Sequence, residues 1–510
     1  MVDQDGIRYH SGMKKHVLAI DQGTTGSTAL VVSLEGETLG RATTEFRQHF
    51  PKPGWVEHDT REIWGSIETS VREAIASAGI KPTDLGGIGI TNQRETTVIW
   101  DRKTGEPIAR AIVWQCRRTA DVCDRLKAEG HEALVREKTG LVIDAYFSAT
   151  KIAWLLDNVS GARARAEKGE LAFGTIDSFV VSKLTGGTVH VTDVTNASRT
   201  LLCDIQKVAW DSELCKLFRV PENVLPKIVG SAEVVAHTKG AGFLPDGIPI
   251  CGIAGDQQAA LFGQACFQEG DAKCTYGTGA FALMNIGKKS LRSTHGLVTT
   301  IALKVGGEVV YALEGSAFIA GAAVQWLRDG LGLIKTAADI EPLARQVESS
   351  DGCVFVPALA GLGAPYWDQD ARGTITGITR GTTSAHLARA TLEGIAFEVA
   401  DLLVAMTKDA SRPIARLRVD GGAAKNDLLM QFQADVLGVA IDRPTDVEST
   451  GRGAAMLAAV GADLAKPADA ARLVKKDKDF APKMDKAARD AHVARWHHAI
   501  VQTRAKPPKK

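Results

Sequence analysis

The chain has 510 residues, which at roughly 150 residues per domain is too long for one small module and long enough for two or three domains with sizeable cores. Lys and Arg number 61 against 60 Asp and Glu, so no chain-wide charge attracts polyanions, and we expect no nucleic-acid partner and no membrane partner. Apolar residues at 45% and charged residues at 24% are typical of globular proteins and exclude a disordered or collagen-like chain.

No segment predicts secretion or membrane insertion. The first 15 residues lack the apolar region of a signal peptide, and the longest strongly apolar stretch, Cys353 to Trp367, is interrupted by prolines and glycines. The eight cysteines are scattered without a C-x-x-C pair, which disfavours a metal cluster or a disulfide framework. We therefore expect a cytoplasmic protein.

The first predicted elements form a hairpin with a polar turn. A strand at Val17 to Ile20 ends at Asp21, a Gly/Thr turn follows, and a second strand runs from Thr28 to Ser33. Further strands, Ile88 to Thr91 and Thr97 to Trp100, enclose the polar residues 92–95. Charged side chains are thus expected at the ends of buried strands.

The middle of the chain predicts helices and then a second copy of the hairpin. Helical patterns cover Arg118 to Glu129 and Ala149 to Asp157, and a strand at Ile250 to Ile253 leads to Asp256. A strand, the turn Gly277-Thr278-Gly279 and a strand at Phe281 to Asn285 repeat the opening pattern. The sequence therefore predicts a tail at 1–15 and two related halves, 16–264 and 265–510.

The last predicted elements are a strand, a glycine turn and a helix. The strand Leu417 to Val419 leads into Gly421-Gly422, and a helix follows at Asp427 to Leu437. Unpaired N–H groups at such a helix start favour an anionic ligand. The segment from Ala471 to Lys510 is rich in Lys and Arg, and we interpret it as a solvated helix and tail.

Two familiar nucleotide-binding patterns do not fit. Gly277 to Ala282 matches G-x-G-x-x-A, but a strand is predicted after the glycines where the dinucleotide fingerprint requires a helix, and Thr299 to Lys304 holds no acid. The Walker pattern G-x-x-x-x-G-K-[ST] is absent from the sequence.

Several polar residues allow both a chemical and a structural interpretation. The turn after Asp21 is suited to phosphate oxygens, with the carboxylate supporting Mg²⁺, or it is an ordinary hairpin turn. Arg94 and Glu95 suit the hydroxyls of a small polyol, or they form a structural ion pair.

Asp256 also allows two interpretations. Its carboxylate suits a general base for an attacking hydroxyl, or it caps a helix at Gln257 to Gln264. Trp114 and Tyr146 either wall a pocket or pack in the core.

Long motifs in a fixed order resemble the glycerol-phosphorylating members of the FGGY carbohydrate kinase family, over residues 17–461. The motifs include DQGTTGSTA, PKPGWVEHD, GITNQRETT, AIVWQCRRT, DAYFSATK, HVTDVTNASRT, GIAGDQQAALFG, YGTGAF, YALEGSAFIAGAAVQWLRD and RVDGGAAKNDLLMQFQAD. The resemblance implies an α/β fold of two actin-like, ribonuclease-H-like lobes with the active site in the cleft between them. It also implies transfer of the γ-phosphoryl of ATP to a terminal hydroxyl of glycerol, with ATP and Mg²⁺ as cofactors, and a homo-oligomer, a dimer or a tetramer.

The resemblance assigns roles to individual residues. Asp256 would be the catalytic base. The polyol would meet Arg94, Glu95, Trp114, Tyr146, Asp256, Gln257 and Phe281. The nucleotide would meet Thr24, Thr25, Gly26, Thr278, Gly321, Gln325, Gly422 and Asn426. Asp21 and Asp256 would support the metal ion.

The chain departs from the family pattern at three places. Thr28 stands where many relatives have an arginine, and Ala145 stands where proline is usual before Tyr146, which would loosen that loop. Residues 240–247 differ from the loop of relatives inhibited by fructose 1,6-bisphosphate, so we predict no such inhibition.

Two alternatives to glycerol phosphorylation stay open at this point. One alternative is a kinase of the same family that acts on another small polyol or a ketose. From another class, it would be a nucleotide-operated binding module with the same architecture, although such a module has no use for a base at Asp256.

Overall fold

The computed structural model describes residues 16–446, 448–470 and 474–504, and these divide into two compact units. Unit 1 holds residues 16–263, 301–309 and 450–470, and unit 2 holds 264–300, 310–446, 448–449 and 474–504. The chain first passes from unit 1 to unit 2 beside the expected boundary at 264/265 and later returns to unit 1 twice. The expected N-terminal tail and residues 505–510 of the basic tail lie outside the described residues.

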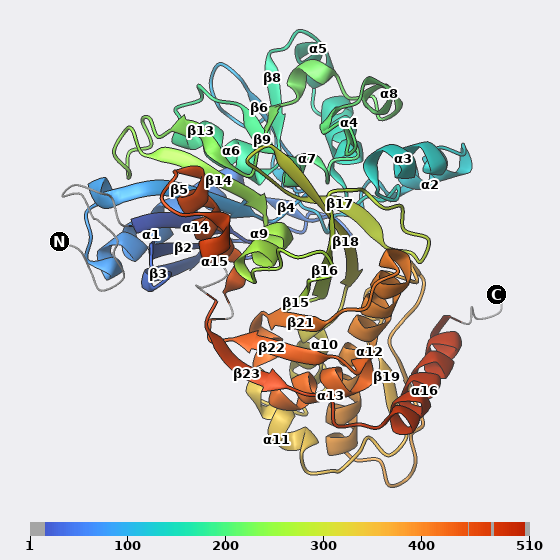
Figure 1. Ribbon diagram of the computed structural model, residues 1–510. Helices are drawn as coiled ribbons and strands as arrows, with labels where there is room; N and C mark the ends of the chain where they lie inside the picture. Colours follow the sequence, from blue (N-terminus) through green and yellow to red (C-terminus); the bar gives the residue numbers. More distant parts are fainter. Residues whose placement is uncertain (1–15, 447, 471–473, 505–510) are drawn as a thin grey trace. The chain divides into compact units, whose positions relative to one another are not determined.

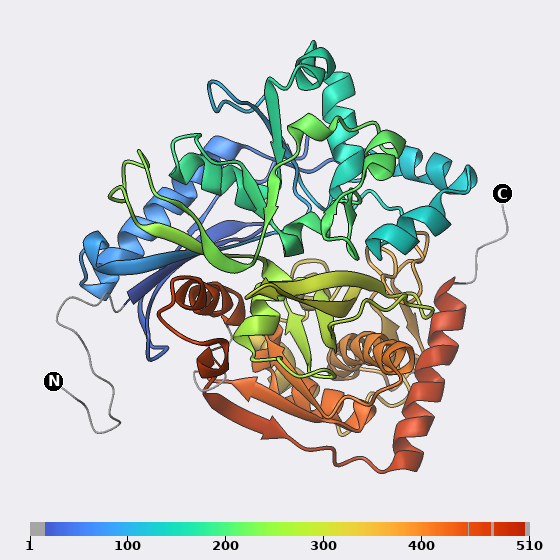
Figure 2. The same cartoon turned by 45° about the horizontal axis from the view of Figure 1, so that its top comes forward.

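Unit 1 is built on a mixed β-sheet (Figures 1 and 2). Its strands in spatial order are β3 (Thr38–Glu45), β2 (Gly26–Ser33), β1 (His16–Gln22), β5 (Leu85–Asn92), β14 (Pro249–Gly255) and β13 (Ala232–His237). The pairs β3–β2, β2–β1 and β14–β13 are antiparallel, whereas β1–β5 and β5–β14 are parallel. Three neighbouring strands, β1, β5 and β14, therefore end at one edge.

Short pairs of strands complete unit 1. They are β4 (Glu57–His58) with β7 (Ala111–Ile112), β6 (Val98–Asp101) with β8 (Leu171–Gly174), β9 (Val191–Asp193) with β12 (Lys227–Val229), and β10 (Cys203–Asp204) with β11 (Ala209–Trp210).

The helices of unit 1 lie mostly in the connections between its strands. They are α1 (Thr60–Ala78), α2 (Ala120–Ala128), α3 (Glu132–Thr139), α4 (Ser148–Asn158), α5 (Ala162–Glu167), α6 (Ile176–Leu184), α7 (Val194–Ala197), α8 (Ser212–Leu217), α9 (Asp256–Gly263), most of α14 (Ser449–Gly461), α15 (Pro467–Ala470) and the 3₁₀ turns η1 (Pro82–Asp84) and η2 (Glu222–Val224).

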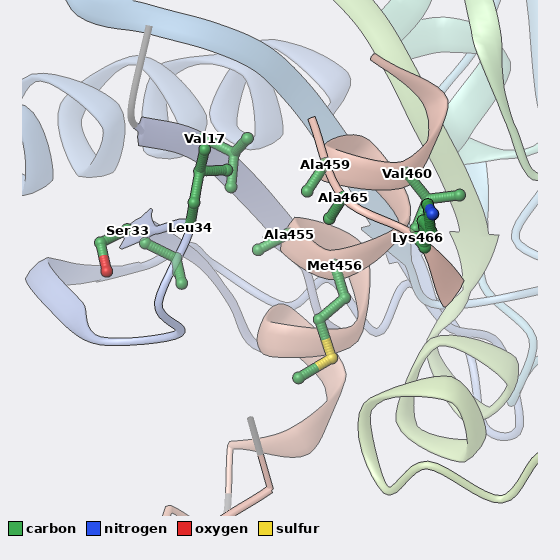
Figure 3. A pocket seen from close by; sticks show the side chains of 10 residues that line it. Val17, Ser33, Leu34, Ala455, Met456, Ala459, Val460, Ala465 and Lys466 are labelled. Atoms are coloured by element: carbon green, nitrogen blue, oxygen red, sulfur yellow. The ribbon is translucent and has the colours of Figure 1, made fainter. Parts of the chain in front are cut away.

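Alternating side chains of β1 bury both faces of the unit 1 sheet. Leu18 and Ile20 pack with α1 and α6 in one core, and Val17 and Ala19 pack with the alanines of α14 in the other. Figure 3 shows an apolar pocket where α14 meets the start of β1 and the end of β2, lined by Val17, Val32, Ser33, Leu34, Ala455, Met456, Ala459, Val460, Ala465 and Lys466. None of the predicted site residues lines this pocket, because they follow the opposite ends of the strands.

Unit 2 repeats the strand order of unit 1. Its strands follow one another in space in the order β18 (Glu308–Ala317), β16 (Ala280–Gly287), β15 (Ala272–Tyr276), β21 (Arg416–Asp420), β22 (Ala440–Pro444) and β23 (Lys476–Phe480), as part of a 13-stranded sheet. As in unit 1, the three strands that begin the order are antiparallel, the next two pairs are parallel and the last pair is antiparallel. The matching orders, β3-β2-β1-β5-β14-β13 and β18-β16-β15-β21-β22-β23, agree with the duplication inferred from the sequence.

The other elements of unit 2 are mainly helical. They are α10 (Gly321–Asp329), α11 (Ile340–Ala344), α12 (Ser384–Ala410), α13 (Asp427–Leu437), α16 (Lys486–Arg504), the 3₁₀ turns η3 (Ala337–Asp339) and η4 (Gly422–Lys425), and the pair β19 (Val354–Val356) and β20 (Thr374–Thr376). The strands β17 (Val298–Val305) and β18 contribute residues to both units. In the described part of the chain, every helix is too short or too polar to cross a membrane.

Candidate active site

The predicted polyol residues of unit 1 gather at the carboxyl ends of its parallel strands. Asp21 of β1 and Ala254 of β14 are both register partners of Thr91 in β5, so Asp256 lies just past the strand end that Asp21 approaches. Arg94 and Glu95 follow β5 at the same edge. Loops at the carboxyl edge of parallel strands are where α/β folds bind ligands.

At this edge the positive side chain of Arg94 lies between two negative ones, Asp256 and Glu95. Arg94 Nε lies 3.2 Å from Asp256 Oδ1 and 3.8 Å from Glu95 Oε1. The guanidinium of Arg94 also donates to Gln258 Oε1 at 3.2 Å and to the Tyr146 hydroxyl at 3.4 Å. Arg94 and Glu95 lie within ion-pair distance of each other, as the structural interpretation expected, but the closer partner of Arg94 is Asp256.

The charged side chains at this edge differ in how far they are buried. The side chains of Arg94 and Glu95 are 2% and 1% exposed, whereas that of Asp256 is 31% exposed. Asp256 is the first residue of α9, and its Oδ1 accepts the N–H of Gln257 at 2.7 Å. A buried arginine and a backbone N–H both favour the ionised carboxylate, and the partial exposure leaves it accessible to a ligand.

The aromatic residues predicted to wall the pocket lie together. The rings of Trp114 and Tyr146 meet edge to face with centroids 5.5 Å apart. The Trp114 indole N–H donates to the Thr24 hydroxyl at 3.0 Å, which joins a predicted polyol residue to a predicted nucleotide residue. Both aromatic side chains are only half-buried, as a pocket wall requires.

The Tyr146 loop is anchored by a buried lysine. Lys151 Nζ donates to the carbonyl oxygens of Ala145, Tyr146 and Phe147 at 3.2, 2.6 and 2.9 Å. Burial lowers the pKa of Lys151 to about 8. The N–H of Tyr146 donates to Asp144, which also pairs with Arg117. These contacts fix the loop around Ala145, where the sequence suggested a looser conformation.

The phosphate-binding turn predicted at 21–26 is a hairpin turn supported by glutamines. Gly23 N–H donates to Gly26 O at 2.9 Å between β1 and β2, and Phe46 N–H donates to Thr25 O at 3.2 Å. Gln48 Nε2 donates to Thr24 O at 2.9 Å. Thr25 itself is exposed.

A buried histidine links this turn to the polyol loop. His58 Nε2 lies 2.6 Å from Gln48 Oε1, and its Nδ1 lies 3.3 Å from Gln93 Nε2, which also donates to Gly23 O. Burial lowers the pKa of His58 to about 3, so the ring is neutral and donates from one nitrogen while it accepts at the other. His58 belongs to the PKPGWVEHD motif, to which the motif pattern alone assigned no role.

The predicted turn residues of unit 2 lie at the equivalent ends of its strands. Gly277 N–H donates to Gly279 O at 2.9 Å in the turn between β15 and β16, as Gly23 does in unit 1. Gly277 O and Thr278 O accept the N–H groups of Gly321 and Ala320 at the start of α10. A Cβ on Gly321 would lie 2.7 Å from Gly277 O, so this close approach requires glycine.

The remaining unit 2 candidates lie in α10, after β21 and inside β16. Gly422 and Gln325 are exposed, and Asn426 caps α13 by accepting the N–H of Leu429 at 2.9 Å. Gly421, before Gly422, has φ +86° and packs against the Tyr276 backbone, which ties the glycine turn to the strand before Thr278. Phe281 lies half-buried in β16, opposite Thr275 and Ser316.

Carboxylate oxygens of the kind present in unit 1 suit Mg²⁺. Among the described residues no three His, Cys, Asp or Glu side chains form a ready-made metal cluster. Mg²⁺ commonly uses one or two carboxylates together with water and substrate phosphates. Asp21, near the end of β1, and Asp256, just past the end of β14, lie on the two strands that flank β5 and are the candidate carboxylates for such a donor set.

Two charged residues of the site were missed from the sequence. Arg199 Nε donates to Glu95 Oε1 at 2.6 Å, and Lys151 holds the Tyr146 loop. Both stand in motifs that the sequence singled out, HVTDVTNASRT and DAYFSATK. The available signal was an arginine or lysine inside a motif that otherwise holds mostly uncharged residues, because such side chains are buried only when paired.

Comparison with known proteins places the chain in a family. Residues 16–263 match the model of the FGGY family of carbohydrate kinases, N-terminal domain, and residues 272–462 match the model of its C-terminal domain. The chain therefore belongs to the FGGY family of carbohydrate kinases, and the expected α/β fold of two related domains is confirmed.

Within the family, the chain is similar to glycerol kinases. It is 57% identical to the glycerol kinase of Myxococcus xanthus over 95% of this chain and 99% of that one. It is 56% identical to the glycerol kinase of Deinococcus radiodurans over 96% and 98% of the respective chains. The crystal structure of Plasmodium falciparum glycerol kinase with ADP matches with a TM-score of 0.90 and 37% identity over 98% of this chain and 100% of that one.

Proposed function

We propose that this chain transfers the γ-phosphoryl of ATP to glycerol and forms sn-glycerol 3-phosphate. Similarity to glycerol kinases over nearly the whole chain, at 57% and 56% identity, supports the substrate. The observation that carries the proposal is the buried polar cluster around Arg94, in which one guanidinium contacts Asp256, Gln258 and Tyr146. Such a cluster binds hydroxyl groups, since it offers both donors and acceptors.

In this proposal unit 1 supplies most polyol contacts and unit 2 most nucleotide contacts. Arg94, Glu95, Tyr146 and Gln257 would bind the hydroxyls, with Trp114 and Phe281 beside the carbon chain. Thr278, Gly321, Gln325, Gly422 and Asn426 would meet the nucleotide, together with Thr24, Thr25 and Gly26. The turns at Gly23 and Gly277 present backbone N–H groups, which suit phosphate oxygens.

Asp256 would act as the general base. Phosphoryl transfer asks little covalent work of a protein, so placement of the hydroxyl and stabilisation of charge are the main tasks. Arg94 and the Gln257 N–H hold the Asp256 carboxylate at the end of β14, where it would accept the proton of the attacking hydroxyl.

Asp21 and Asp256 would hold Mg²⁺, which when bound supplies positive charge against the triphosphate. The tasks of the chain's own residues are to orient the hydroxyl, take its proton and keep competing water away from the nucleotide. The predicted dimer or tetramer stays a prediction, which analytical ultracentrifugation of the purified chain tests.

A polyol panel tests the substrate. Rates of ADP release with glycerol, erythritol, xylulose and gluconate at equal ATP separate glycerol phosphorylation from the other activities of the family. We expect the highest kcat/KM with glycerol, and a large loss with propane-1,2-diol, because a missing hydroxyl leaves buried polar groups unpaired. Equal or faster turnover of another polyol would refute the assignment. ATP binding without transfer to any of them would favour the binding module.

A further inference from the structure

Arg199 is a fully buried arginine that contacts two of the proposed polyol residues. Its side chain is 0% exposed, and its Nε donates to Glu95 Oε1 at 2.6 Å. Its guanidinium also lies over the rings of Tyr146 and Phe147, at 5.5 and 5.1 Å from their centroids. One side chain thus fixes both the carboxylate and the aromatic ring through charge and cation–π contact.

The segment before Arg199 is tied to the strand end that carries Glu95. Asp193 caps α7 by accepting the N–H groups of Thr195 and Asn196, both at 3.0 Å. Asn196 and Asn92 then exchange reciprocal amide hydrogen bonds at 3.0 and 3.1 Å. Asn92 is the last residue of β5, just before Glu95. The hydrogen bonds therefore hold α7, which precedes Arg199, against the loop that carries Glu95.

The same segment also reaches the strand that ends at Asp256. Thr195 Oγ1 accepts the N–H of Gly255 at 2.8 Å and donates to Asp193 Oδ1 at 2.8 Å. A Cβ on Gly255 would lie 2.7 Å from the stem of Arg94, which shows how closely the Arg94 side chain crosses this strand end.

Arg199 determines how the charges of the site are shared. Glu95 lies 2.6 Å from Arg199 but 3.8 Å from Arg94, and Arg94 lies 3.2 Å from Asp256. Each carboxylate therefore has its own nearer arginine. Without Arg199, the buried Glu95 would have to draw Arg94 toward itself, since an unpaired buried carboxylate is strongly disfavoured. Arg94 would then move away from Asp256.

We propose that Arg199 is a positioning residue of the polyol site: it holds Glu95 as an ionised hydrogen-bond acceptor and leaves Arg94 to pair with Asp256. The role follows from the contacts of Arg199 and rests on the proposed function of that site. An ionised Glu95 only accepts hydrogen bonds, so Arg199 sets a requirement for a hydroxyl donor on the substrate at this position.

The test combines Arg199→Met, Arg199→Lys and a double-mutant cycle with Glu95→Gln. We expect Arg199→Met to lower kcat/KM for glycerol by about 30-fold or more, as truncation of one partner of a buried charge pair does. The KM for ATP should stay within about twofold. Lysine keeps the charge but not the planar fork, so Arg199→Lys should recover part of the loss. In the Glu95→Gln background, Arg199→Met should add little, because the two residues act together.

Arg118→Met is the matched control in the same unit. The side chain of Arg118 is also buried, with 1% exposed, and its guanidinium lies 2.8 Å from Glu57 Oε1. The guanidinium also lies over the rings of Trp55 and Trp154, at 3.9 and 4.7 Å from their centroids. We expect this variant to lower the melting temperature without a selective change in the KM for glycerol, because Glu57 is not one of the proposed polyol residues.

Four outcomes would overturn the proposal. They are an unchanged kcat/KM in Arg199→Met, equal effects on glycerol and ATP, additive losses in the cycle, and the same kinetic pattern in Arg118→Met. If Arg199→Met does not fold, Arg199→Lys carries the test. An Arg199→Lys variant with the wild-type KM for glycerol and the wild-type discrimination against propane-1,2-diol would contradict the role proposed for the planar guanidinium. The wild-type rate on glycerol reports on the proposed function separately, since the variant ratios are measured on whichever polyol the wild type prefers.

Discussion

Glu398 is a buried carboxyl group of α12 whose neighbours disfavour its charge. Glu398 is 6% exposed, and Asp401 follows one turn later on the same helix. Asp401 accepts hydrogen bonds from the Tyr366 hydroxyl and the Trp496 indole, each at 2.7 Å, and lies 3.0 Å from His497 Nε2. Burial first, and the charge of Asp401 second, raise the pKa of Glu398 to about 8.

This raised pKa predicts that the free energy of unfolding falls as the pH rises from 4.5 to about 8. Between the ordinary carboxyl pKa of 4.5 and about 8, folded Glu398 holds a proton that the unfolded chain has released, so stability falls as pH rises through this window. Glu398→Gln removes the ionisation, and its advantage over the wild type should grow from pH 5 to pH 9 by on the order of a few kcal/mol.

Chemical denaturation across pH measures this difference. Glu348→Gln, at an exposed position of the same unit, is the control, and the titration of His497 is common to all variants. A constant difference between Glu398→Gln and the wild type at every pH would contradict the proposed environment of Glu398.

The residues of the site differ in how far the sequence could reveal them. The motifs led to Asp256 and Arg94, and the structure brings these two to 3.2 Å. The pairing of Glu95 with Arg199 was missed, because a contact between residues so distant in the chain depends on how α7 packs against the end of β5. Local spacing carries no record of such tertiary pairs.

At the scale of elements, α14 packs unusually closely on the unit 1 sheet. A Cβ on Gly89 of β5 would lie 2.1 Å from the Ala454 carbonyl oxygen, and one on Gly252 of β14 would lie 2.5 Å from the Ala458 N. The small residues of strands and helix together allow this approach. The fit positions the strand ends that carry Arg94 and Asp256.

Gly89→Ala should therefore destabilise the protein. The added methyl has no space, and overpacking a close-packed core costs about 1–3 kcal/mol or more. Gly65→Ala is the matched control, because Gly65 lies exposed inside α1 and a methyl added there would have no atom within 4 Å. That change should be stabilising by roughly 0.5–1 kcal/mol, since alanine favours helix interiors. Thermal unfolding of both variants checks the signs, and an equal effect of the two would contradict the packing account.

Strand and helix positions were predictable to different degrees. The predicted helix at Asp427 to Leu437 matches α13 at both ends, where Asn426 and Gly438 cap it. The strand predicted at Ile88 to Thr91 is β5, which extends from Leu85 to Asn92, since its polar and glycine ends carry no apolar signal. The sequence predicted the repeated hairpin, β1–β2 and β15–β16, but neither the order of the remaining strands nor their register.

At the scale of the whole molecule, each unit contributes six strands in the same order, and each carries many of its predicted ligand residues past the carboxyl ends of its parallel strands. The residues proposed to bind glycerol fall mainly in unit 1 and those proposed to bind the nucleotide mainly in unit 2. Under the proposed function, one repeated architecture would carry two different binding edges, with charged side chains after β5 in unit 1 and glycines after β21 in unit 2.

This division predicts separate footprints for the two ligands. Hydrogen exchange with glycerol alone should slow amides at 93–96, 145–149 and 255–258, whereas ADP alone should slow those at 277–279, 320–322 and 421–426, because bound ligands suppress local opening. Arg94→Leu should remove the first footprint and leave the second. Protection of both sets by glycerol alone would contradict the assignment of contacts to units.

The most direct measurement is the single-turnover rate of glycerol phosphorylation by Asp256→Asn with saturating glycerol, ATP and Mg²⁺. Asparagine keeps the shape of the side chain but cannot accept the proton at neutral pH. The account predicts a rate about 10²-fold or more below the wild type, in line with general-base contributions, with ATP binding retained. A rate close to that of the wild type would show that the hydroxyl loses its proton elsewhere.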